Sequence, residues 1–515
     1  MAYVLIGFMG AGKSSAAQEL ARSLGVSAQD SDALLAARLG HSIAQEFERH
    51  GEDSFRALEE QLVCELLGNA GSEDVISLGG GSVLSARVRE ALAGHVTVLL
   101  DVEPDAAWER VCAAPNGSER PLARDRDAFL ALHADRRAVY EELADAILPA
   151  LHRGAIARTA GSLRALAAAP AGTHMLWANS ASGEYPVLVG RGLLGDRDPA
   201  AIWPLDRSSS RCFCVSDETV AALYGQRLGE MAATIAIAPG EAHKTLASAE
   251  RVWHALVRAG FTRADHVVAL GGGVVGDLAG FCAATYQRGV PIVHVPTTLV
   301  AQVDSAYGGK TGVDLPEAKN YVGAYHQPAG VLVDPDTLAT LPAAELAAGW
   351  VEVLKTALIA GGRLWEKVAS GADVDESTIL ACARTKLAVV AADERDAHAR
   401  QALNLGHTVG HAIETASGYA RYRHGEAVGL GLLAALRLSG RDQLRAQVRE
   451  LLDSRGLPVT LTDVPVELVV DATARDKKRV GAEVPFVLVQ EPGQLRIGCH
   501  VQAGDLRDAV AELVA

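Results

Sequence analysis

Residues 7–14 read Gly-Phe-Met-Gly-Ala-Gly-Lys-Ser and directly follow the apolar run Tyr3 to Ile6. Their spacing matches the phosphate-loop pattern G-x-x-x-x-G-K-[ST], and a helical stretch follows as far as Leu24. In such a loop, backbone N–H groups and a helix N-terminus bind phosphate oxygens, while the lysine reaches the β- and γ-phosphates and the serine ligates Mg²⁺. The sequence therefore predicts a nucleotide site at Gly10, Ala11, Gly12, Lys13, Ser14 and Ser15.

The bulk composition limits the classes of function. A chain of 515 residues predicts roughly two to four domains. Because the net charge is -15 and no run of Lys and Arg occurs, nucleic acid is not an expected partner. The seven cysteines include no C-x-x-C pair, which favours reduced thiols in a cytoplasmic protein. The sequence has neither a signal-like segment nor an apolar run of about 20 residues, so no membrane association is expected.

Alternating strand-like and helical patterns predict an α/β protein with a boundary near residue 172. The first unit, 1–170, is expected to be a parallel sheet flanked by helices around the phosphate loop. The second, 171–515, is expected to have two lobes, with an α/β lobe over about 174–341 and a mostly helical lobe over about 342–515. The helical expectation rests on the Ala-, Leu- and Glu-rich periodicity that begins after Pro342.

Three features of the first unit narrow the phosphoryl acceptor. Asp32 follows the expected second strand, Arg56 lies in the next helical stretch, and Gly79-Gly-Gly81 ends a further strand. An acid and a base together suit an acceptor that carries both a hydroxyl and a carboxylate. With Arg120-Pro-Leu122 and Arg136, these motifs make residues 1 to 145 resemble shikimate kinase. Beyond Asp145 the family's final strand and helix are hard to align.

This resemblance implies ATP with Mg²⁺ as cofactor and shikimate as acceptor. Asp32 would orient or deprotonate the shikimate hydroxyl, and Arg120, in the family's lid, would cover the transferring phosphoryl group. Arg56 and Arg136 would pair with the carboxylate and Gly80 would contribute a backbone contact. The alternative is a regulatory nucleotide-binding module without catalysis, although Lys13, Ser14, Asp32 and Arg120 are all present.

The second unit contains a glycine-rich turn and a group of histidines. Residues 271–277 satisfy G-x-G-x-x-G after an apolar run, but the acid that an ordinary dinucleotide fold places about 20 residues later is missing. His407 and His411 lie one helical turn apart, and His424 follows soon after. The spacing predicts a metal site but leaves two ligand sets open. These sets are His407, His411 and Glu414, or His407, His424 and a distant carboxylate such as Glu352.

Repeated cations beside apolar or glycine-rich runs indicate an anionic substrate for the second unit. Together with Pro239-Gly-Glu-Ala-His-Lys244, Gln302-Val-Asp304-Ser and Asp476-Lys-Lys478, these motifs resemble 3-dehydroquinate synthase from about Tyr185 to the C-terminus. A metal-dependent polyol dehydrogenase is the alternative, but a neutral polyol gives no reason for five cations. Those cations are Lys310, Lys319, Lys355, Lys386 and Arg400.

The second resemblance implies a residue set for each ligand. Glu352, His407 and His424 would bind Zn²⁺ or Co²⁺. NAD would contact Glu241, Lys244, Gly273, Val274, Val275, Gly276, Asp277, Thr297, Thr298, Lys310, Lys319, Thr337 and Thr340. The substrate pocket would contain Arg288, Asn320, Lys386, Arg400, Asn404 and Lys477, with Asp304, Lys310, Lys355 and His411 as catalytic residues.

The implied reaction converts 3-deoxy-D-arabino-heptulosonate 7-phosphate to 3-dehydroquinate and phosphate, with NAD returned unchanged. The family also implies a homodimer in which Arg288 reaches the neighbouring subunit's site. The whole chain is thus expected to be a bifunctional enzyme of aromatic biosynthesis. Its two steps are not consecutive, so the fusion need not imply channelling.

Overall fold

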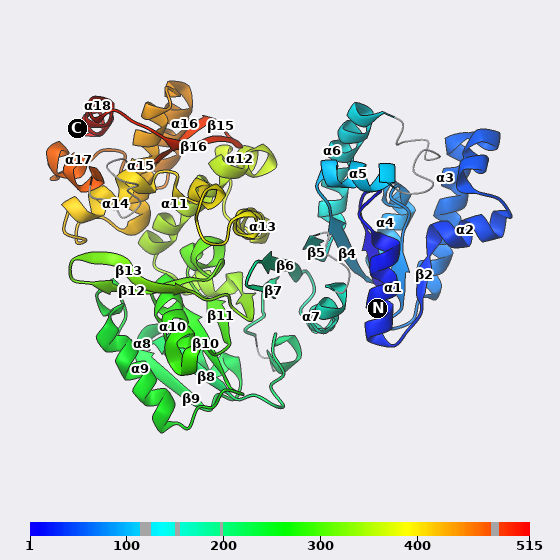
Figure 1. Ribbon diagram of the computed structural model, residues 1–515, viewed down its shortest axis with the longest axis horizontal. Coiled ribbons are helices and arrows are strands. Elements are labelled where there is room, and N and C mark those ends of the chain that lie inside the picture. The colour runs from blue at the N-terminus through cyan, green and yellow to red at the C-terminus, as the bar shows by residue number, and fades with distance from the viewer. Residues whose placement is uncertain (114–124, 150–154, 196–198, 475–483, 515) are drawn as a thin grey trace. The chain divides into compact units, whose positions relative to one another are not determined.

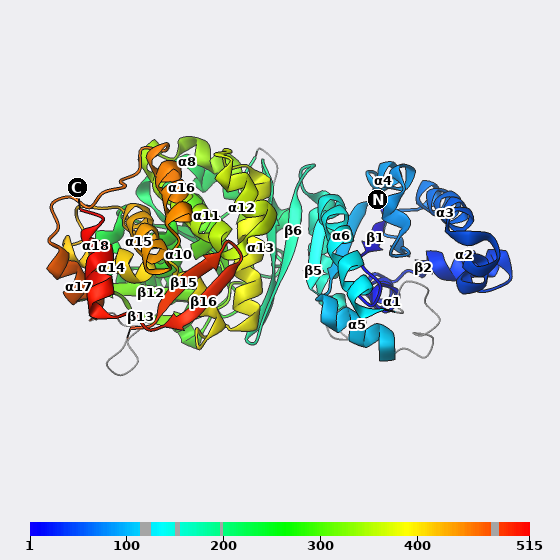
Figure 2. The same ribbon diagram turned by 90° about the horizontal axis from the view of Figure 1, so that it is seen from above.

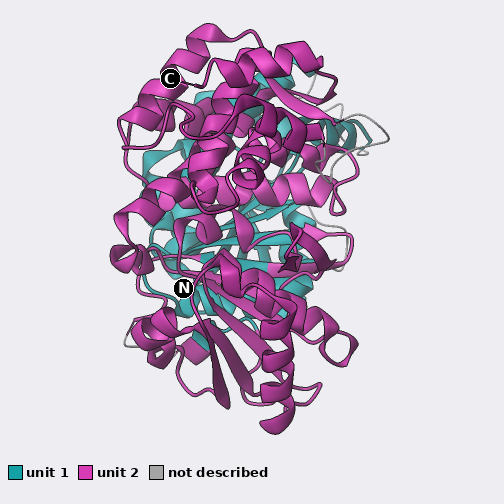
Figure 3. Ribbon diagram, turned by 90° about the vertical axis from the view of Figure 1, so that its left-hand side faces the viewer, with its two compact units in different colours: residues 1–178, 186–188, 201–204 teal, residues 179–185, 189–200, 205–515 magenta. Residues whose placement is uncertain are grey.

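The computed structural model describes residues 1–113, 125–149, 155–195, 199–474 and 484–514. Two residues assigned to sites from the sequence, Arg120 and Lys477, lie outside these ranges. The chain forms two compact units, coloured separately in Figure 3. Unit 1 comprises 1–178, 186–188 and 201–204, and unit 2 comprises 179–185, 189–200 and 205–515. Among the described residues, no helix combines the length and the apolar character needed to cross a bilayer.

Unit 1 is built on a parallel sheet in the order β2-β3-β1-β4-β5-β6 (Figure 1). Because parallel neighbours need crossover connections, helices alternate with the strands. The strands are β1 (Tyr3–Ile6), β2 (Ala28–Asp30), β3 (Val75–Ser77), β4 (Val96–Asp101), β5 (Ala146–Pro149) and β6 (His174–Ser180). The helices are α1 (Lys13–Leu24), α2 (Ser31–Leu39), α3 (Ile43–Asn69), α4 (Ala86–Leu92), α5 (Pro104–Ala113), α6 (Arg126–Leu143) and α7 (Ile156–Ala168).

The loop that joins β1 to α1 follows from its glycines. All four residues of β1 are buried, and the strand ends before Gly7, whose φ is 141°. Gly12, at φ 89°, caps α1 in the left-handed region, where a side chain would be strained. The final strand and helix of the shikimate kinase resemblance, which are hard to align from the sequence alone, correspond to β5 and α7. A four-residue strand carries too short a pattern to be read reliably.

The α/β lobe of unit 2 contains the parallel strands β14-β11-β10-β8-β9. The glycine-rich turn joins β10 to α10 as expected. An antiparallel hairpin, β12–β13, lies between these strands and the helical lobe in Figure 1 and packs on α10. Strand β7 (Gly183–Val189) has residues in both units. The other strands of the lobe are β8 (Cys212–Asp217), β9 (Ala233–Ile237), β10 (His266–Gly271), β11 (Ile292–Pro296), β12 (Lys310–Leu315), β13 (Ala318–Tyr325) and β14 (Gly330–Val333). The helices are α8 (Glu218–Tyr224), α9 (Leu246–Arg258) and α10 (Gly273–Thr285).

The C-terminal lobe is mostly helical, as the periodicity predicts, and ends with one hairpin and a short helix (Figure 2). Its helices are α11 (Ala343–Ala360), α12 (Gly362–Ala369), α13 (Glu376–Ala392), α14 (His407–Ala416), α15 (His424–Leu438), α16 (Asp442–Asp453), α17 (Val466–Ala474) and α18 (Ala503–Ala511). The hairpin strands are β15 (Phe486–Glu491) and β16 (Gln494–Cys499).

Close helix packing in this lobe depends on glycine. A β-carbon at Gly410 of α14 would lie 3.0 Å from the Cα of Val428 in α15. One at Gly425, at the start of α15, would overlap the Ala348 carbonyl oxygen of α11. Because only glycine permits such approaches, α14 packs closely on α15, and the start of α15 packs closely on α11. Helices α14 and α15 carry His407, His411 and His424.

Candidate active sites

The phosphate loop of unit 1 has its lysine folded over the loop. Lys13 Nζ donates hydrogen bonds to the carbonyl oxygens of Gly7, at 2.9 Å, and Phe8, at 3.1 Å. These contacts hold the ammonium against the backbone of the loop that leads into α1, where a phosphate would also meet backbone N–H groups. The geometry suits binding of a nucleotide's terminal phosphates.

The acceptor residues gather around the turn Gly79–Gly81, which follows β3. A β-carbon at Gly79 would lie 2.6 Å from both Asp32 Oδ1 and Glu59 Oε1, and one at Gly81 would overlap the Arg56 guanidinium. Arg56 is oriented by two carboxylates, since Nη1 donates to Glu59 Oε2 at 2.7 Å and Nη2 to Glu52 Oε1 at 3.0 Å. The Arg56 guanidinium is thereby fixed at the same glycine turn as the Asp32 carboxylate. An acceptor that carries both a hydroxyl and a carboxylate requires such a pair.

The third expected shikimate contact, Arg136 of α6, is buried beside Tyr140. The Tyr140 hydroxyl donates to the Gly80 carbonyl oxygen at 2.5 Å, so α6 is tied to the glycine turn. Burial raises the pKa of Tyr140 to about 12 and keeps this hydroxyl a donor. Gly80 also approaches the phosphate loop, because a β-carbon there would lie 3.5 Å from the Gly7 carbonyl oxygen. Asp32 and Arg56 therefore approach the turn Gly79–Gly81, and Tyr140, beside Arg136, contacts the same turn.

Unit 2 encloses a cavity of about 1350 Å³ between its α/β lobe and its helical lobe. Most residues predicted for NAD, substrate and metal line it. The lining residues that the sequence analysis expects to contact NAD are Glu241, Lys244, Gly273, Val274, Val275, Asp277, Thr297, Thr298, Lys310, Lys319 and Thr340. The lining residues expected to serve substrate, catalysis or metal are Asp304, Asn320, Glu352, Lys355, Lys386, Arg400, Asn404, His407, His411 and His424.

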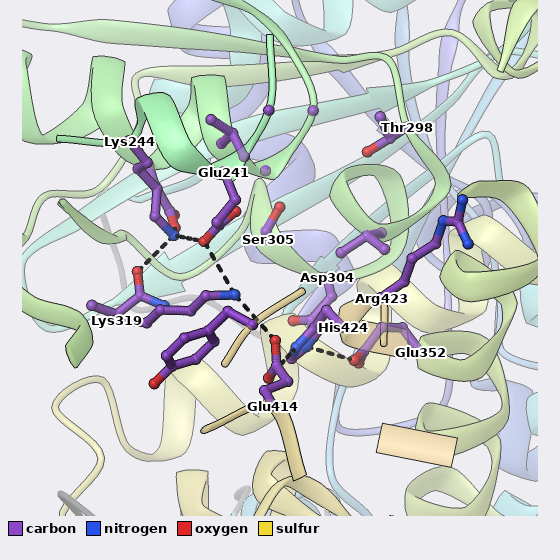
Figure 4. Close-up of a pocket in the computed structure, with 18 of the residues that line it drawn as sticks. Glu241, Lys244, Thr298, Asp304, Ser305, Lys319, Glu352, Glu414, Arg423 and His424 are labelled. Carbon is purple, nitrogen blue, oxygen red and sulfur yellow. Dashed lines mark hydrogen bonds and ion pairs between the residues drawn. The ribbon is translucent and has the colours of Figure 1, made fainter. Parts of the chain in front are cut away.

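Lys244 is the centre of an acidic cluster on the α/β side. Its Nζ lies 2.7 Å from Glu241 Oε1 (Figure 4). The same nitrogen lies 3.4 Å from Asp277 Oδ2 and donates to Asn320 Oδ1 at 2.9 Å. Burial raises the pKa of Asp277 to about 6, against the opposing effect of Lys244. The cluster thus places hydrogen-bond acceptors beside the glycine-rich turn, where a dinucleotide's ribose hydroxyls could donate to them.

Glu352 of α11 faces two histidines from different helices. Its Oε1 lies 3.5 Å from Nε2 of His407 and 3.5 Å from Nε2 of His424. Both carboxylate oxygens are buried, and Oε2 pairs with Lys355 Nζ at 2.5 Å, so Oε1 is the oxygen that faces the two histidines. One ring nitrogen from each of His407, His411 and His424 lies within 4.8 Å of the others. This donor set fits a divalent metal such as Zn²⁺.

The same point of the cavity carries strong negative charge. Burial opposes protonation of His424, but the carboxylates of Glu352 and Glu414 outweigh this effect and raise the pKa of His424 to about 10. A field that favours a cation on the imidazole also favours a bound metal cation.

A row of alternating charges extends from Glu352 along the cavity through Lys355 and Asp304 to Lys386. Lys355 Nζ lies 2.5 Å from Glu352 Oε2 and 2.9 Å from Asp304 Oδ2, and Lys386 pairs with Asp304 Oδ1. Burial alone would raise the pKa of Asp304, but the two ammonium groups outweigh it and hold that pKa well below its usual value. Arg400, 1% exposed, donates to the backbone carbonyls of Glu394 and Gly308. The cations are therefore fixed before a substrate arrives.

Three predicted residues lie off this cavity. Gly276 and Arg288 are not among its lining residues. Thr337 is buried, where its hydroxyl donates to the Asp334 carbonyl oxygen at 2.8 Å and accepts from Gln302 Nε2 at 2.9 Å. In this chain Thr337 holds the backbone that leads to Thr340, which does line the cavity.

Sequence reasoning missed Asp217, which lines the cavity at the carboxyl end of β8. Ligands of open parallel sheets bind at that edge, so an acid that ends a strand was the available signal. Glu414, considered from spacing as a possible ligand, instead lies on the Nδ1 side of His424, where its Oε2 is 3.2 Å away.

Comparison with known proteins identifies both units. The shikimate kinase family matches residues 9–160, and the N-terminal and C-terminal domains of 3-dehydroquinate synthase match 234–348 and 349–479. The 3-dehydroquinate synthase of Halorhodospira halophila (strain DSM 244 / SL1) is 42% identical over 355 residues, which cover 66% of this chain and 99% of that protein. The chain belongs to the 3-dehydroquinate synthase family.

A second relative, the 3-dehydroquinate synthase of Methylococcus capsulatus (strain ATCC 33009 / NCIMB 11132 / Bath), is 43% identical over 345 residues, 63% of this chain and 94% of that protein. With the kinase match, these findings make the chain a fusion of shikimate kinase and 3-dehydroquinate synthase, with both activities. The alternatives considered from sequence, a polyol dehydrogenase and a non-catalytic nucleotide module, are therefore not supported.

Solved structures agree with the fold of unit 2. The 2-epi-5-epi-valiolone synthase of Streptomyces hygroscopicus subsp. jinggangensis 5008, solved with NAD⁺ and Zn²⁺ bound, has a TM-score of 0.58 and 27% identity, over 64% of this chain and 96% of that one. A 2-deoxy-scyllo-inosose synthase has a TM-score of 0.58 at 24% identity, over 66% of this chain and 100% of that one, which shows a shared fold.

Proposed function

We propose that the cavity of unit 2 binds NAD on its α/β side and a divalent metal at Glu352, His407 and His424, and that it performs the synthase reaction between them. The observation that carries this proposal is the position of Glu352 Oε1, 3.5 Å from Nε2 of two histidines in the cavity that the glycine-rich turn also lines. The valiolone synthase with NAD⁺ and Zn²⁺ bound supports the same pair of ligands. Zn²⁺ and Co²⁺ both suit the donor set.

When bound, NAD⁺ accepts and returns a hydride, and the metal acidifies the alcohol at the reacting carbon. The chain's own residues hold the substrate. Lys355, Lys386 and Arg400 provide fixed positive charges for the phosphate and carboxylate groups of a heptulosonate phosphate. Asp304 holds Lys355 and Lys386 in place through its two oxygens. Preorganised cations stabilise developing negative charge without first having to rearrange.

The test is a turnover assay with the heptulosonate phosphate and catalytic NAD⁺, in which phosphate and absorbance at 340 nm are followed together. Many turnovers of phosphate without accumulating NADH are expected. Glu352→Gln should abolish this activity and lose stoichiometric metal, whereas Glu366→Gln, which removes the same charge from an exposed position on α12, should retain both. Full metal content in Glu352→Gln would exclude this ligand set.

For unit 1 we propose that Asp32 orients or deprotonates the shikimate hydroxyl, that Arg56 and Arg136 bind its carboxylate, and that Lys13 and Ser14 serve ATP and Mg²⁺. The meeting of Asp32, Arg56 and Gly80 beside the phosphate loop supports these roles. Asp32→Asn should lower shikimate phosphorylation severely. Asp105→Asn, at an exposed carboxylate paired with Arg126, should not. Unchanged phosphorylation in Asp32→Asn would refute the role of that residue.

We further propose a homodimer through unit 2, in which Arg288 serves the neighbouring subunit's cavity. The position of Arg288 outside its own cavity is compatible with this role. Mixing two inactive variants, Arg288→Ala and Lys355→Met, should restore part of the activity, because one site of each mixed dimer would then be intact. The absence of any recovery, with a mixed dimer confirmed by mass, would refute the proposal.

A further inference from the structure

Glu414 is neither a metal ligand nor a cofactor contact in the function proposed above, yet it lies between a proposed metal ligand and a proposed NAD contact. It occupies α14, one turn beyond His411, and is 3% exposed. Its Oε2 lies 3.2 Å from His424 Nδ1, and its Oε1 accepts from Lys319 Nζ at 3.2 Å (Figure 4). One buried carboxylate therefore contacts a proposed metal ligand through one oxygen and a proposed cofactor residue through the other.

The contact with His424 fixes which ring nitrogen faces the metal site. With Nδ1 directed at Glu414, Nε2 is the nitrogen directed at Glu352. An acceptor at Nδ1 holds the proton there and raises the electron-donating strength of Nε2. His407 is oriented in the same way, with Nε2 directed at Glu352, but its Nδ1 has a neutral acceptor, the Leu405 carbonyl oxygen at 3.1 Å. Of these two imidazoles, His424 has the charged partner, which polarises it more strongly.

The contact with Lys319 connects α14 to the hairpin β12–β13. Lys319 lies on β13, with its Nζ 4.6 Å from the centre of the Tyr419 ring and 4.0 Å from Glu241 Oε1. Glu414 and Tyr419 thus fix the Lys319 ammonium from the helical side, while Glu241 approaches it from the α/β side. The side chain that orients His424 also fixes a cation on the cofactor side of the cavity.

We propose that Glu414 is a positioning residue that orients and polarises His424 for the metal and, through its second oxygen, holds Lys319 in place for NAD. The inference rests on the proposed function, since it takes His424 as a metal ligand and Lys319 as a cofactor contact. It predicts that the loss of one carboxylate weakens the binding of two different ligands. Loss of the Lys319 side chain alone is expected to weaken the binding of NAD and not the binding of Zn²⁺.

The experiment measures Zn²⁺ affinity of the full-length apoprotein by competition with a chromophoric chelator, and NAD⁺ affinity of the zinc-loaded protein by calorimetry. Glu414→Gln keeps an oxygen for His424 but loses the charge, and should weaken Zn²⁺ binding about 10-fold, while Glu414→Ala should weaken it about 100-fold. The visible spectrum of the Co²⁺-loaded protein should also change in both variants, because it reports ligand geometry. A residue that only supports folding would leave that spectrum unaltered.

Two control variants distinguish a specific role of Glu414 from a general effect of lost charge and from an effect of Lys319 alone. Glu426→Gln removes an equal charge from the first turn of α15, where Glu426 pairs with Arg423, and should leave Zn²⁺ affinity within about 3-fold of wild type. Lys319→Met should weaken NAD⁺ binding and leave Zn²⁺ affinity unchanged. Circular dichroism of each apoprotein checks folding, and Glu414→Asp, which keeps the charge, replaces Glu414→Ala if the latter is unfolded.

The outcomes separate this inference from the function on which it rests. If Glu352→Gln loses Zn²⁺ but Glu414→Gln and Glu414→Ala bind it as wild type does, only the role of Glu414 is overturned. Equal losses in Glu414→Gln and Glu426→Gln would overturn it too, since the effect would then be one of net charge. If Glu352→Gln keeps full Zn²⁺ affinity, the proposed metal site itself is wrong.

Discussion

Gly431 of α15 lies against Gly406, the residue that caps α14, so closely that a β-carbon at position 431 would overlap the Gly406 carbonyl oxygen. Gly406 itself has φ 76° and precedes His407. The contact between the two glycines therefore sets the spacing of the helices that carry the proposed metal ligands.

Gly431→Ala should separate α14 from α15 and weaken metal binding. Overpacking of this kind costs about 1–3 kcal/mol, partly offset by the better helix propensity of alanine. The matched control is Gly429→Ala in the same helix, where the new β-carbon would lie 3.3 Å from the flexible end of Leu452 and at ordinary contact distance, 3.8 Å, from Val351 Cγ1. That variant should be neutral or slightly stabilised. Chemical denaturation and chelator titration measure both effects, and equal behaviour of the two variants would contradict the packing argument.

Much of both sites could be predicted because their motifs are contiguous. The phosphate loop, the turn Gly79–Gly81 and the histidines of α14 each place several functional groups within a few residues. The choice between Glu352 and Glu414 as a ligand could not be read from spacing, because α11 and α14 are far apart in the chain. That choice depends on helix packing, which glycines such as Gly425 and Gly431 decide.

The hairpin β12–β13 was not recognised as such from the sequence. Its residues, 310–325, include glycines, a proline and several charged side chains, which are poor strand formers. The pairing is stabilised instead by packing on α10, where a β-carbon at Gly280 would overlap the Thr311 side chain. Lys310, Lys319 and Asn320 could be named from a motif, but their common position on one hairpin required the tertiary structure.

Buried histidines should make unit 2 sensitive to mild acid. Burial lowers the pKa of His294 in β11 and of His266 in β10 to about 4. An unfolded chain binds these protons near pH 6.5, so the contribution to stability is complete above that pH and is lost as the pH falls towards 4. The loss is roughly 3 kcal/mol for each histidine at the lower limit.

Unfolding in urea at pH 7.5 and pH 5.0, followed by a probe in unit 2, tests this expectation. His294→Asn should show a smaller drop in stability between the two pH values than wild type does. His254→Asn, at a histidine whose side chain is 65% exposed on α9, should behave as wild type. Full pH dependence in His294→Asn would show that this histidine does not cause the loss of stability in acid.

Arg56→Lys should impair shikimate binding in unit 1. Lysine cannot reproduce the two-pronged geometry with which Arg56 would bind a carboxylate, and the loss of a charged hydrogen bond of about 1.5–3 kcal/mol predicts a KM for shikimate raised roughly 10- to 100-fold. The KM for ATP and the synthase turnover of the same protein should not change. Arg38→Lys, at an exposed ion pair with Glu65, is the matched control. A KM for shikimate within about twofold of wild type would remove Arg56 from the site.

Lys244→Met should destabilise unit 2 in a way that acid relieves. The substitution leaves Glu241, Asp277 and Asp314 together without their shared ammonium, and an uncompensated buried charge costs about 3–5 kcal/mol. Burial already raises the pKa of Asp277 to about 6 with Lys244 present, so without it Asp277 takes up a proton at still higher pH. The difference in melting temperature between variant and wild type should therefore shrink from pH 8 to pH 5.5.

Lys367→Met, which breaks a more exposed pair with Asp375, should show no such convergence. A gap for Lys244→Met that stays constant over this range would mean that the acidic cluster does not titrate as a unit.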